Sequence, residues 1–337
     1  MRMRGFLRPA AGLTCLVALA TAGCSAAAES APEATRTPTP QTSSAGTSYV
    51  PSYAPYVSAT EASDNDTAGS PSVYNLAFVI ADGSACTPSW NGTNAVGDSS
   101  VASRISALKE DGAEVRVSFG GASGKELAET CSSAAKLAAA YGSALDAAGS
   151  SLADFDIEGD ALTDSDSVDL RSQAIALLQK ERSDLAVSFT LPVMPSGLDA
   201  DSVALLESAN DNSVQVSTVN IMTMNYGESY GGDMGDYAIT SATAAQAQLK
   251  EVFGTSDSTA WRALALTSMI GTNDVDGETF TLSDAAQVRA FAVSKGVGWV
   301  SMWAAFRDQQ CQGDDDALTN CSGVSQAAGA FGEALAG

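Results

Sequence analysis

The chain has 337 residues, 45% of them hydrophobic, so it can build a large apolar core. Its formal net charge of −23 repels nucleic acid and anionic lipid, which excludes the usual nucleic-acid-binding classes and leaves neutral or cationic partners. The sequence contains no histidine, which excludes Ser-His-Asp and Cys-His catalysis and the usual zinc sites. It predicts neither a metal site nor a cofactor.

An export signal is predicted at residues 1–24. Arginines occur among the first eight residues, and Leu13–Ala20 is an apolar stretch too short to span a bilayer. Thr21-Ala-Gly-Cys24 resembles a bacterial lipobox, whose cysteine carries the lipid, so Cys24 is the candidate lipidation site. Ordinary cleavage near residues 26–28 is the alternative. In both cases we expect an extracellular protein, either secreted or lipid-anchored on the outer face of a bacterial cell membrane.

Two regions follow the predicted signal. Residues 25–49 are rich in Ala, Ser, Thr and Pro and have no apolar periodicity, which predicts a flexible linker. Residues 50–337 contain no second linker and predict one α/β domain, which we expect to be a monomer.

Short apolar runs alternate with amphipathic segments along this domain. Strands are predicted at Ser52–Val57, Val73–Ile80, Glu114–Phe119, Leu152–Ile157, Leu185–Leu191, Val219–Met224, Ala263–Met269 and Gly298–Trp303. Helices are predicted at Val101–Glu110, Glu126–Ala148, Ser167–Glu181, Ser202–Ala209, Ala242–Phe253, Asp284–Ser294 and Val324–Leu335. This order predicts a (β/α)8 TIM barrel with a degenerate first βα unit, because residues 60–71 lack a clear helix. A doubly wound open sheet is the alternative, but no Gly-rich phosphate loop follows any strand.

Four cysteines lie beyond the predicted signal and its Cys24. An even number in an exported chain predicts two disulfides. Cys311 and Cys321 are close enough in sequence to close a C-terminal loop, which leaves Cys86 with Cys131. This is one of three connectivities.

Acidic residues alternate with apolar ones in Asp154-Phe-Asp-Ile-Glu158. In a strand, this alternation places Asp154, Asp156 and Glu158 on one face. Folding alone gives no reason to bring repelling carboxylates together, whereas a site that needs separated pKa values does. A calcium loop is the alternative reading, but Ser165 occupies the position where such a loop requires Glu.

Other predicted strands also end in residues suited to a site. Gly120-Gly121 follow the third strand, Asn225-Tyr226 follow the sixth, and Trp303 ends the eighth. The carboxyl ends of barrel strands meet on the face where barrel enzymes carry their chemistry. Three further polar residues at predicted loop ends are expected to be structural: Asp82, Asn273 and Arg307.

These motifs resemble glycoside hydrolase family 18, which contains chitinases and endo-β-N-acetylglucosaminidases. The resemblance covers nearly all of residues 50–325. It rests on four segments: Ser118-Phe-Gly-Gly121, Asp154-x-Asp156-x-Glu158, Met222-Thr-Met-Asn-Tyr-Gly227 and Ser301-Met-Trp303.

The resemblance implies a substrate-assisted mechanism, in which the 2-acetamido carbonyl of the sugar is the nucleophile and configuration is retained. Glu158 is then the general acid and base. Asp156 orients the acetamido group, and Asp154 shares a proton with Asp156, so that the acids titrate as a coupled unit. The hydroxyl of Tyr226 is the candidate group that holds the acetamido oxygen.

The same resemblance assigns the substrate-binding residues. Trp303 is the expected floor beneath the reacting sugar, because pyranose faces pack on aromatic rings. Further contacts are expected from Gly120, Gly121, Met222, Met224 and Asn225. Trp90 and Tyr230 are either outer sugar subsites or ordinary loop aromatics.

Three positions depart from the family pattern. Ser151 stands where the acidic motif commonly begins with Asp, which predicts weakened tuning of the acids rather than lost activity. Met224 and Asn225 stand where the sixth strand commonly has Tyr and Asp. Because Asn cannot ionise, we expect a shifted pH profile.

Three functions follow from the sequence. The first is hydrolysis of β-1,4-linked N-acetylglucosamine in chitin or chito-oligosaccharides. The second is an endo-β-N-acetylglucosaminidase that cleaves N-glycan cores. The third is a non-catalytic barrel that binds chitin, against which the intact Glu158 argues. The expected partner in each case is a glycan that contains N-acetylglucosamine.

Overall fold

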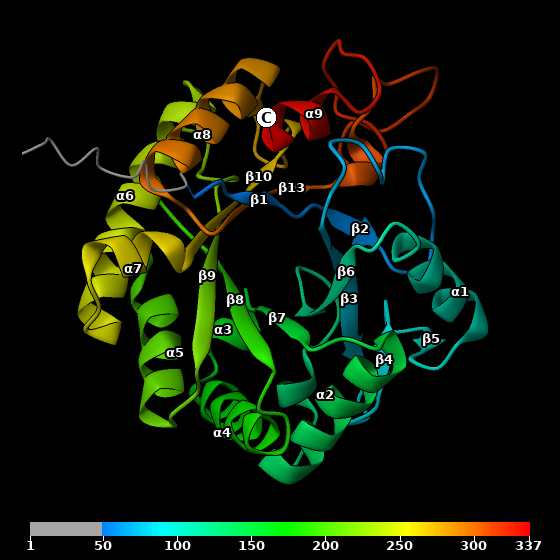
Figure 1. Ribbon diagram of the computed structural model, residues 1–337, viewed down its shortest axis with the longest axis vertical. Coiled ribbons are helices and arrows are strands. Elements are labelled where there is room, and N and C mark those ends of the chain that lie inside the picture. The colour runs from blue at the N-terminus through cyan, green and yellow to red at the C-terminus, as the bar shows by residue number, and fades with distance from the viewer. Residues whose placement is uncertain (1–48) are drawn as a thin grey trace, which may run out of the picture. The chain divides into compact units, whose positions relative to one another are not determined.

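Parallel strands arranged in a closed ring form the centre of the structure, a computed structural model that describes residues 49–337 (Figure 1). The predicted export signal, Cys24 and the predicted linker up to residue 48 lie outside the described residues. Within residues 49–337, no helix is both long and apolar enough to cross a membrane.

The ring is the predicted (β/α)8 barrel, if β1 and β2 are counted as two halves of one strand. All neighbouring strands in it are parallel. In spatial order it consists of β1 (Ser52–Tyr53), β13 (Trp299–Trp303), β10 (Leu264–Met269), β9 (Val216–Met222), β8 (Ala186–Pro192), β7 (Leu152–Asp156), β6 (Glu114–Gly120), β3 (Val73–Ala81) and β2 (Tyr56–Ser58). The described chain has no helix between β2 and β3, as predicted for the first βα unit.

The first barrel strand is split at Pro55, although the sequence predicts one strand over Ser52–Val57. Proline cannot donate to a strand ladder, so the pairing changes sides there. Before the proline, the N–H of Ala54 donates to the carbonyl of Val300 at 3.0 Å. After it, the N–H of Asn75 donates to the carbonyl of Pro55 at 2.9 Å. The two halves therefore join β13 to β3 and close the barrel.

Helices surround the barrel in Figure 1. They are α1 (Ser99–Leu108), α2 (Ala134–Ala148), α3 (Asp160–Thr163), α4 (Ser165–Glu181), α5 (Ala200–Asp211), α6 (Met234–Phe253), α7 (Asp257–Arg262), α8 (Leu282–Lys295) and α9 (Ala330–Ala336), with 3-10 turns η1 (Leu127–Glu129) and η2 (Ala305–Arg307).

Three helices differ from their predicted bounds by a full turn or more at one end. The helix predicted at Glu126–Ala148 is shorter, since Ser133 caps the first turn of α2. The helix predicted at Ala242–Phe253 is longer, because Asp233 caps α6 about two turns earlier. The helix predicted at Val324–Leu335 is confined to α9.

Two small hairpins that the sequence did not predict are added to the barrel. β4 (Pro88–Trp90) and β5 (Asn94–Ala95) extend the sheet from β3, and β11 (Gly271–Thr272) pairs with β12 (Thr279–Phe280) after β10. Both predicted disulfides are confirmed, Cys86–Cys131 and Cys311–Cys321. The second closes a loop that follows η2.

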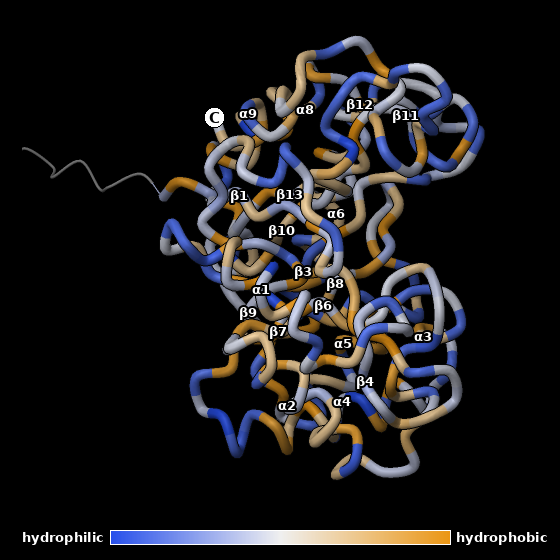
Figure 2. Tube along the Cα trace, turned by 90° about the vertical axis from the view of Figure 1, so that its right-hand side faces the viewer, coloured by the Kyte–Doolittle hydropathy of each residue, from blue (hydrophilic) through white to orange (hydrophobic). Residues whose placement is uncertain are grey.

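Strand register separates an aromatic layer from a polar barrel interior. Phe119, Phe155 and Phe189 are register partners on β6, β7 and β8 and are buried against the helices. Their neighbours Ser118, Asp154 and Ser188 are also register partners and point the other way. The alternation therefore directs one acid of the motif into the barrel. In Figure 2, hydrophilic segments coloured blue are frequent in the peripheral loops.

A buried ion pair fastens the segment after β6 to α4. Arg171 donates to Glu126 Oε2 from Nη2 at 2.8 Å and from Nε at 3.1 Å, and both side chains are almost fully buried. The hydroxyl of Tyr141 donates to Glu126 Oε1 at 2.6 Å. This network supports the backbone of β6 from the helix side.

Candidate active site

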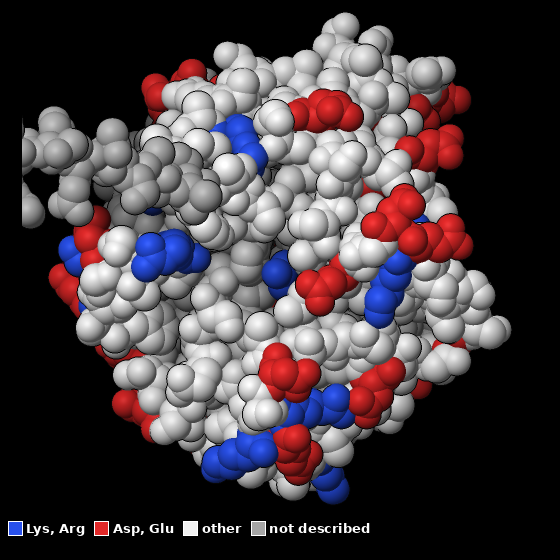
Figure 3. Space-filling model, in the orientation of Figure 1, with Lys and Arg blue, Asp and Glu red and all other residues white. Residues whose placement is uncertain are grey.

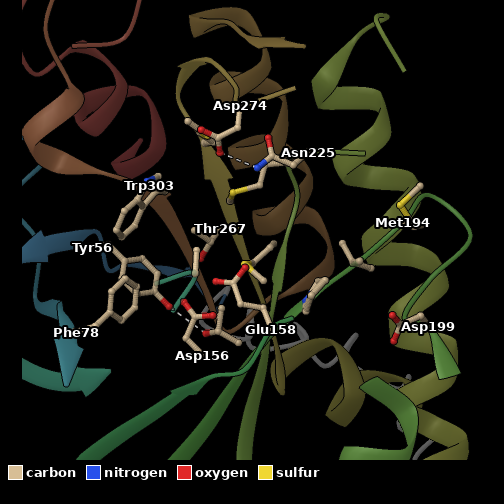
Figure 4. Close-up of a pocket in the computed structure, with 17 residues that line it drawn as sticks. Tyr56, Phe78, Asp156, Glu158, Met194, Asp199, Asn225, Thr267, Asp274 and Trp303 are labelled. Atoms are coloured by element: carbon tan, nitrogen blue, oxygen red, sulfur yellow. Dashed lines mark hydrogen bonds between the residues drawn. The ribbon is translucent and has the colours of Figure 1, made fainter. Parts of the chain in front are cut away.

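A cleft of about 420 Å³ opens at the carboxyl ends of the barrel strands (Figure 4). This volume is in the range of small-ligand pockets. The strand residues that line it include Tyr56, Phe78, Asp156, Thr190, Met222, Thr267 and Trp303. The cleft brings together six of the predicted site residues: Asp156, Glu158, Met222, Met224, Asn225 and Trp303.

The cleft is acidic. Asp156, Glu158, Asp199 and Asp274 line it, and none of its lining residues is Lys or Arg. Acidic side chains are also spread over the molecular face in Figure 3. Such a cleft disfavours anions and suits a neutral or cationic ligand. In the part of the chain that the structure describes, no group of three or more His, Cys, Asp or Glu could hold a metal ion.

Asp154 lies beneath the cleft, with 1% of its surface exposed. Its Oδ2 accepts hydrogen bonds from the hydroxyls of Tyr56 at 2.9 Å and Ser118 at 2.7 Å. Its Oδ1 accepts from Ser188 at 2.7 Å and Thr190 at 2.9 Å. These four donors occupy the acceptor sites of the carboxylate and fix its orientation.

Asp156 lies above Asp154 on the same strand face and is 5% exposed. Burial raises its pKa well above the ordinary value, and the charges of Glu158 and Asp154 raise it further. Its Oδ1 has no hydrogen-bond partner among the described residues. The predicted proton sharing with Asp154 is not present as a direct hydrogen bond between them in residues 49–337. The carboxyl group of Asp156 instead lines the cleft, where a ligand can contact it.

Glu158 follows β7 and is half-buried in the cleft wall. Burial raises its pKa, and the negative charge of Asp274 raises it further. A carboxyl group with a raised pKa stays protonated closer to neutral pH, as a general acid must.

Asp274 is a site residue that the sequence did not reveal. It lies between β11 and β12, and its Oδ2 accepts a hydrogen bond from Asn225 Nδ2 at 2.9 Å (Figure 4). The hairpin is itself attached to the loop after β9, since the backbone N–H of Gly227 donates to Glu278 Oε1 at 2.8 Å. Within the sequence, Asp274 is one acid in a polar turn, and only the fold brings it to Glu158.

Trp303 forms part of an aromatic wall. Its ring stacks on Phe78 with centroids 5.5 Å apart and meets Tyr56 edge-on at 5.8 Å. All three side chains line the cleft. The sequence predicted Trp303 but neither partner, although both partners lie on the first two barrel strands.

Tyr226 does not line the cleft, which contradicts its predicted position at the acetamido group. Its ring packs among tyrosines, and its hydroxyl accepts a hydrogen bond from Ser241 of α6 at 3.3 Å. The reason lies in the backbone, because Asn225 has φ +55° and Gly227 has φ +112°. The chain turns at these residues and directs the intervening side chain toward α6.

Gly120 and Gly121 are not among the residues that line the cleft either, and their predicted contact with substrate stays a prediction. Their φ angles are +99° and +89°, which favour glycine. A Cβ on Gly120 would lie 2.1 Å from the carbonyl oxygen of Asp156, and one on Gly121 would lie 2.9 Å from the Phe78 ring. The two glycines allow β6 to end close against the acidic strand.

The remaining predicted positions lie away from the acids. Ser151 precedes β7 at the opposite end of the barrel, about 20 Å from Glu158 at the strand rise. Trp90 is completely buried in β4, and Tyr230 packs against Tyr226, so neither lines the cleft. Asn273 donates to the carbonyl of Met269 at 2.9 Å, in agreement with its predicted structural role.

Comparison with protein-family models gives no match. A probable bifunctional chitinase/lysozyme of Escherichia coli strain K12 is 34% identical over 275 residues, 76% of this chain and 31% of that protein. Endochitinase 11 of Metarhizium anisopliae is 35% identical over 219 residues, 61% of this chain and 42% of that protein. The chain thus spans less than half the length of the curated relatives that it matches.

A solved structure matches over most of both chains. The catalytic domain of the hyperthermophilic chitinase from Pyrococcus furiosus is 30% identical, with a TM-score of 0.74, and the match covers 85% of this chain and 94% of that one. The chain belongs to glycoside hydrolase family 18. Membership in family 18 accounts for the positions of its motifs, since the acidic motif, Met222 and Trp303 all meet at one cleft.

Proposed function

We propose that this protein hydrolyses β-1,4-linked N-acetylglucosamine in chitin or chito-oligosaccharides, with Glu158 as general acid and base. The observation that carries the proposal is the position of Asp156 and Glu158 in one cleft with an aromatic wall, where burial raises the pKa of both carboxyl groups. The names of the similar proteins support the same chemistry, because the chitinase catalytic domain aligns over nearly its whole length.

The reaction begins with proton transfer from Glu158 to the glycosidic oxygen. As the bond between this oxygen and the anomeric carbon breaks, the acetamido carbonyl oxygen of the same sugar bonds to that carbon and forms an oxazolinium ion. The leaving sugar departs with the proton. Glu158 then removes a proton from water, which attacks the anomeric carbon, reopens the ring and gives a product of retained β configuration.

Asp156 and Asp154 assist from below the reacting sugar. The carboxyl group of Asp156, which lines the cleft, is suited to accept the acetamido N–H, which orients the internal nucleophile. When this carboxyl group ionises, its negative charge also stabilises the positive charge of the oxazolinium ion. Asp154 is held by four hydroxyl groups and keeps its neighbour in place.

We infer that the enzyme works outside the cell as a monomer. The two disulfides support an extracellular location, since disulfides persist in oxidising compartments. Secretion, or a lipid on Cys24, would bring the domain there.

The test uses purified protein and chito-oligosaccharides, with products separated by chromatography and their anomers followed by NMR. Wild type should release β-anomers, and Glu158→Gln should lower kcat by roughly 10²- to 10⁴-fold, the usual effect of a lost general acid. Glu251→Gln, an exposed glutamate on α6, is the matched control and should keep wild-type activity.

Other outcomes would replace the proposal. Early release of the α-anomer would exclude the substrate-assisted mechanism. Cleavage of N-glycoproteins but not of chitin oligomers would favour an endo-β-N-acetylglucosaminidase. Binding of oligomers by an inactive wild type would favour a lectin.

A further inference from the structure

Arg307 follows the aromatic wall and has a completely buried side chain. Its guanidinium donates to three backbone carbonyls, Trp303 from Nη1 at 3.0 Å, Thr272 from Nη2 at 2.8 Å and Ala317 from Nη2 at 2.7 Å. One side chain therefore joins three segments that lie apart in the sequence.

Two of these segments carry residues of the cleft. Trp303 contributes its ring to the aromatic wall, and Thr272 precedes Asp274 by two residues in the β11–β12 hairpin. The N–H of Ile270 also donates to the Trp303 carbonyl, at 3.2 Å. Arg307 thus fixes the spacing between the wall that receives the sugar and the acid that faces Glu158.

The third segment is the loop that the Cys311–Cys321 disulfide closes, in which Ala317 lies. Immediately after this loop, the carbonyl of Ser322 accepts a hydrogen bond from the N–H of Thr272 at 2.7 Å. A Cβ on Gly271 would lie 1.8 Å from the same carbonyl oxygen, so the two backbones are in direct contact. The segment that follows the disulfide loop therefore packs directly against the β11–β12 hairpin.

Packing alone gives no reason for an arginine at this position. Among the described residues, no carboxylate forms a salt bridge with Arg307, and its Nε has no partner. Burying an unpaired charge is costly. Burial lowers the pKa of Arg307 to about 10, against the opposing charges of Asp274 and Asp316, so the group is still charged at neutral pH. The planar guanidinium has donors on separate nitrogens and reaches carbonyls of three segments from Nη1 and Nη2.

We propose that Arg307 is a positioning residue for glycoside hydrolysis, which holds Trp303 and the Asp274 hairpin at a fixed spacing around the sugar. This inference rests on the proposed function. The loop closed by Cys311–Cys321 contributes to the same positioning, because Arg307 also donates to its Ala317 carbonyl.

The test compares Arg307→Lys with wild type in two assays. Lysine keeps the charge but loses the fork. At a temperature well below the unfolding midpoint, kcat/KM on chito-oligosaccharides should fall on the order of tenfold to a hundredfold, as expected for small displacements in a site. In a Glu158→Gln background, where turnover is suppressed, the Kd of chitotriose measured by calorimetry should rise in parallel, which a change in stability alone would not produce.

Arg104→Lys is the matched control. Arg104 is largely buried and pairs with Asp66 at 2.6 Å, away from the cleft, so its substitution should leave KM and Kd unchanged. If Arg307→Lys lowers only the melting temperature and leaves kcat, KM and Kd at wild-type values, the inference is overturned.

A second variant covers the case in which Arg307→Lys does not fold. The double substitution Cys311→Ser with Cys321→Ser should raise KM and Kd in the same direction, and unchanged values would overturn the inference. Failure of the proposed function is a separate result, because it appears in the wild type, which would then cleave no chito-oligosaccharide.

Discussion

Asn225 Nδ2 donates a hydrogen bond to Asp274 Oδ2 at 2.9 Å and thereby joins the loop after β9 to the β11–β12 hairpin. The sequence comparison expects an acid at position 225. Position 225 instead carries the neutral amide of Asn225. The negative charge is that of Asp274, in the β11–β12 hairpin after β10. The carboxylate that faces Glu158 is therefore supplied from a different loop, and the pH dependence of the enzyme should reveal it.

Asp274→Asn should lower the pKa of Glu158. Burial would still raise this pKa, but the second cause, the Asp274 charge, would be gone. Activity requires protonated Glu158 and is lost as pH rises through its pKa, so the alkaline limb of kcat/KM should move to lower pH. The other carboxyl groups around the cleft, Asp156 and Asp199, are unchanged. Asp276→Asn, in the same hairpin, is the control, and an unmoved limb for Asp274→Asn would contradict the prediction.

Tyr56→Phe should reduce kcat far more than Tyr226→Phe. The first substitution removes a donor from the buried carboxylate of Asp154, and a hydrogen bond to a charged group contributes about 1.5–3 kcal/mol. Its kcat should therefore fall by at least tenfold. The second removes a hydroxyl outside the cleft and should change kcat by less than about twofold. Steady-state assays on one oligosaccharide decide this, and a large loss for Tyr226→Phe would restore its predicted catalytic role.

Arg171→Met should destabilise the fold strongly, because it leaves Glu126 buried without its partner. Breaking a buried pair in this way costs about 3–5 kcal/mol. Arg182→Met removes the exposed pair with Asp146 and should cost less than about 1 kcal/mol. Urea unfolding followed by circular dichroism measures both. Equal decreases in the free energy of unfolding for the two variants would contradict the prediction that the buried pair contributes more than the exposed one.

The fold could be predicted because its signals are local. Each barrel strand is an apolar run, and the alternation in Asp154-Phe-Asp assigns one face to the core and the other to the barrel interior. Proline interrupts a strand ladder, so Pro55 indicated a possible break, but the pairing of the first half depends on Val300, far away in the sequence.

The site could be predicted only in part, because two kinds of information are absent from a linear motif. Backbone angles are one, since the left-handed turn at Asn225 redirects Tyr226 away from the cleft. Long-range contact is the other, since Asp274 reaches Glu158 only through the hairpin after β10. The motif glycines allow close backbone approach, which depends on neighbours that the linear motif does not contain.

The split first strand also fixes when the catalytic apparatus can exist. β1 is made near the start of the domain, yet its partner β13, which carries Trp303 of the cleft, is made near the end. Until residues 299–303 have emerged, the ring stays open and the cleft lacks Trp303. A nascent or interrupted chain therefore carries the complete acidic motif without an assembled cleft, which is completed only by the last strand.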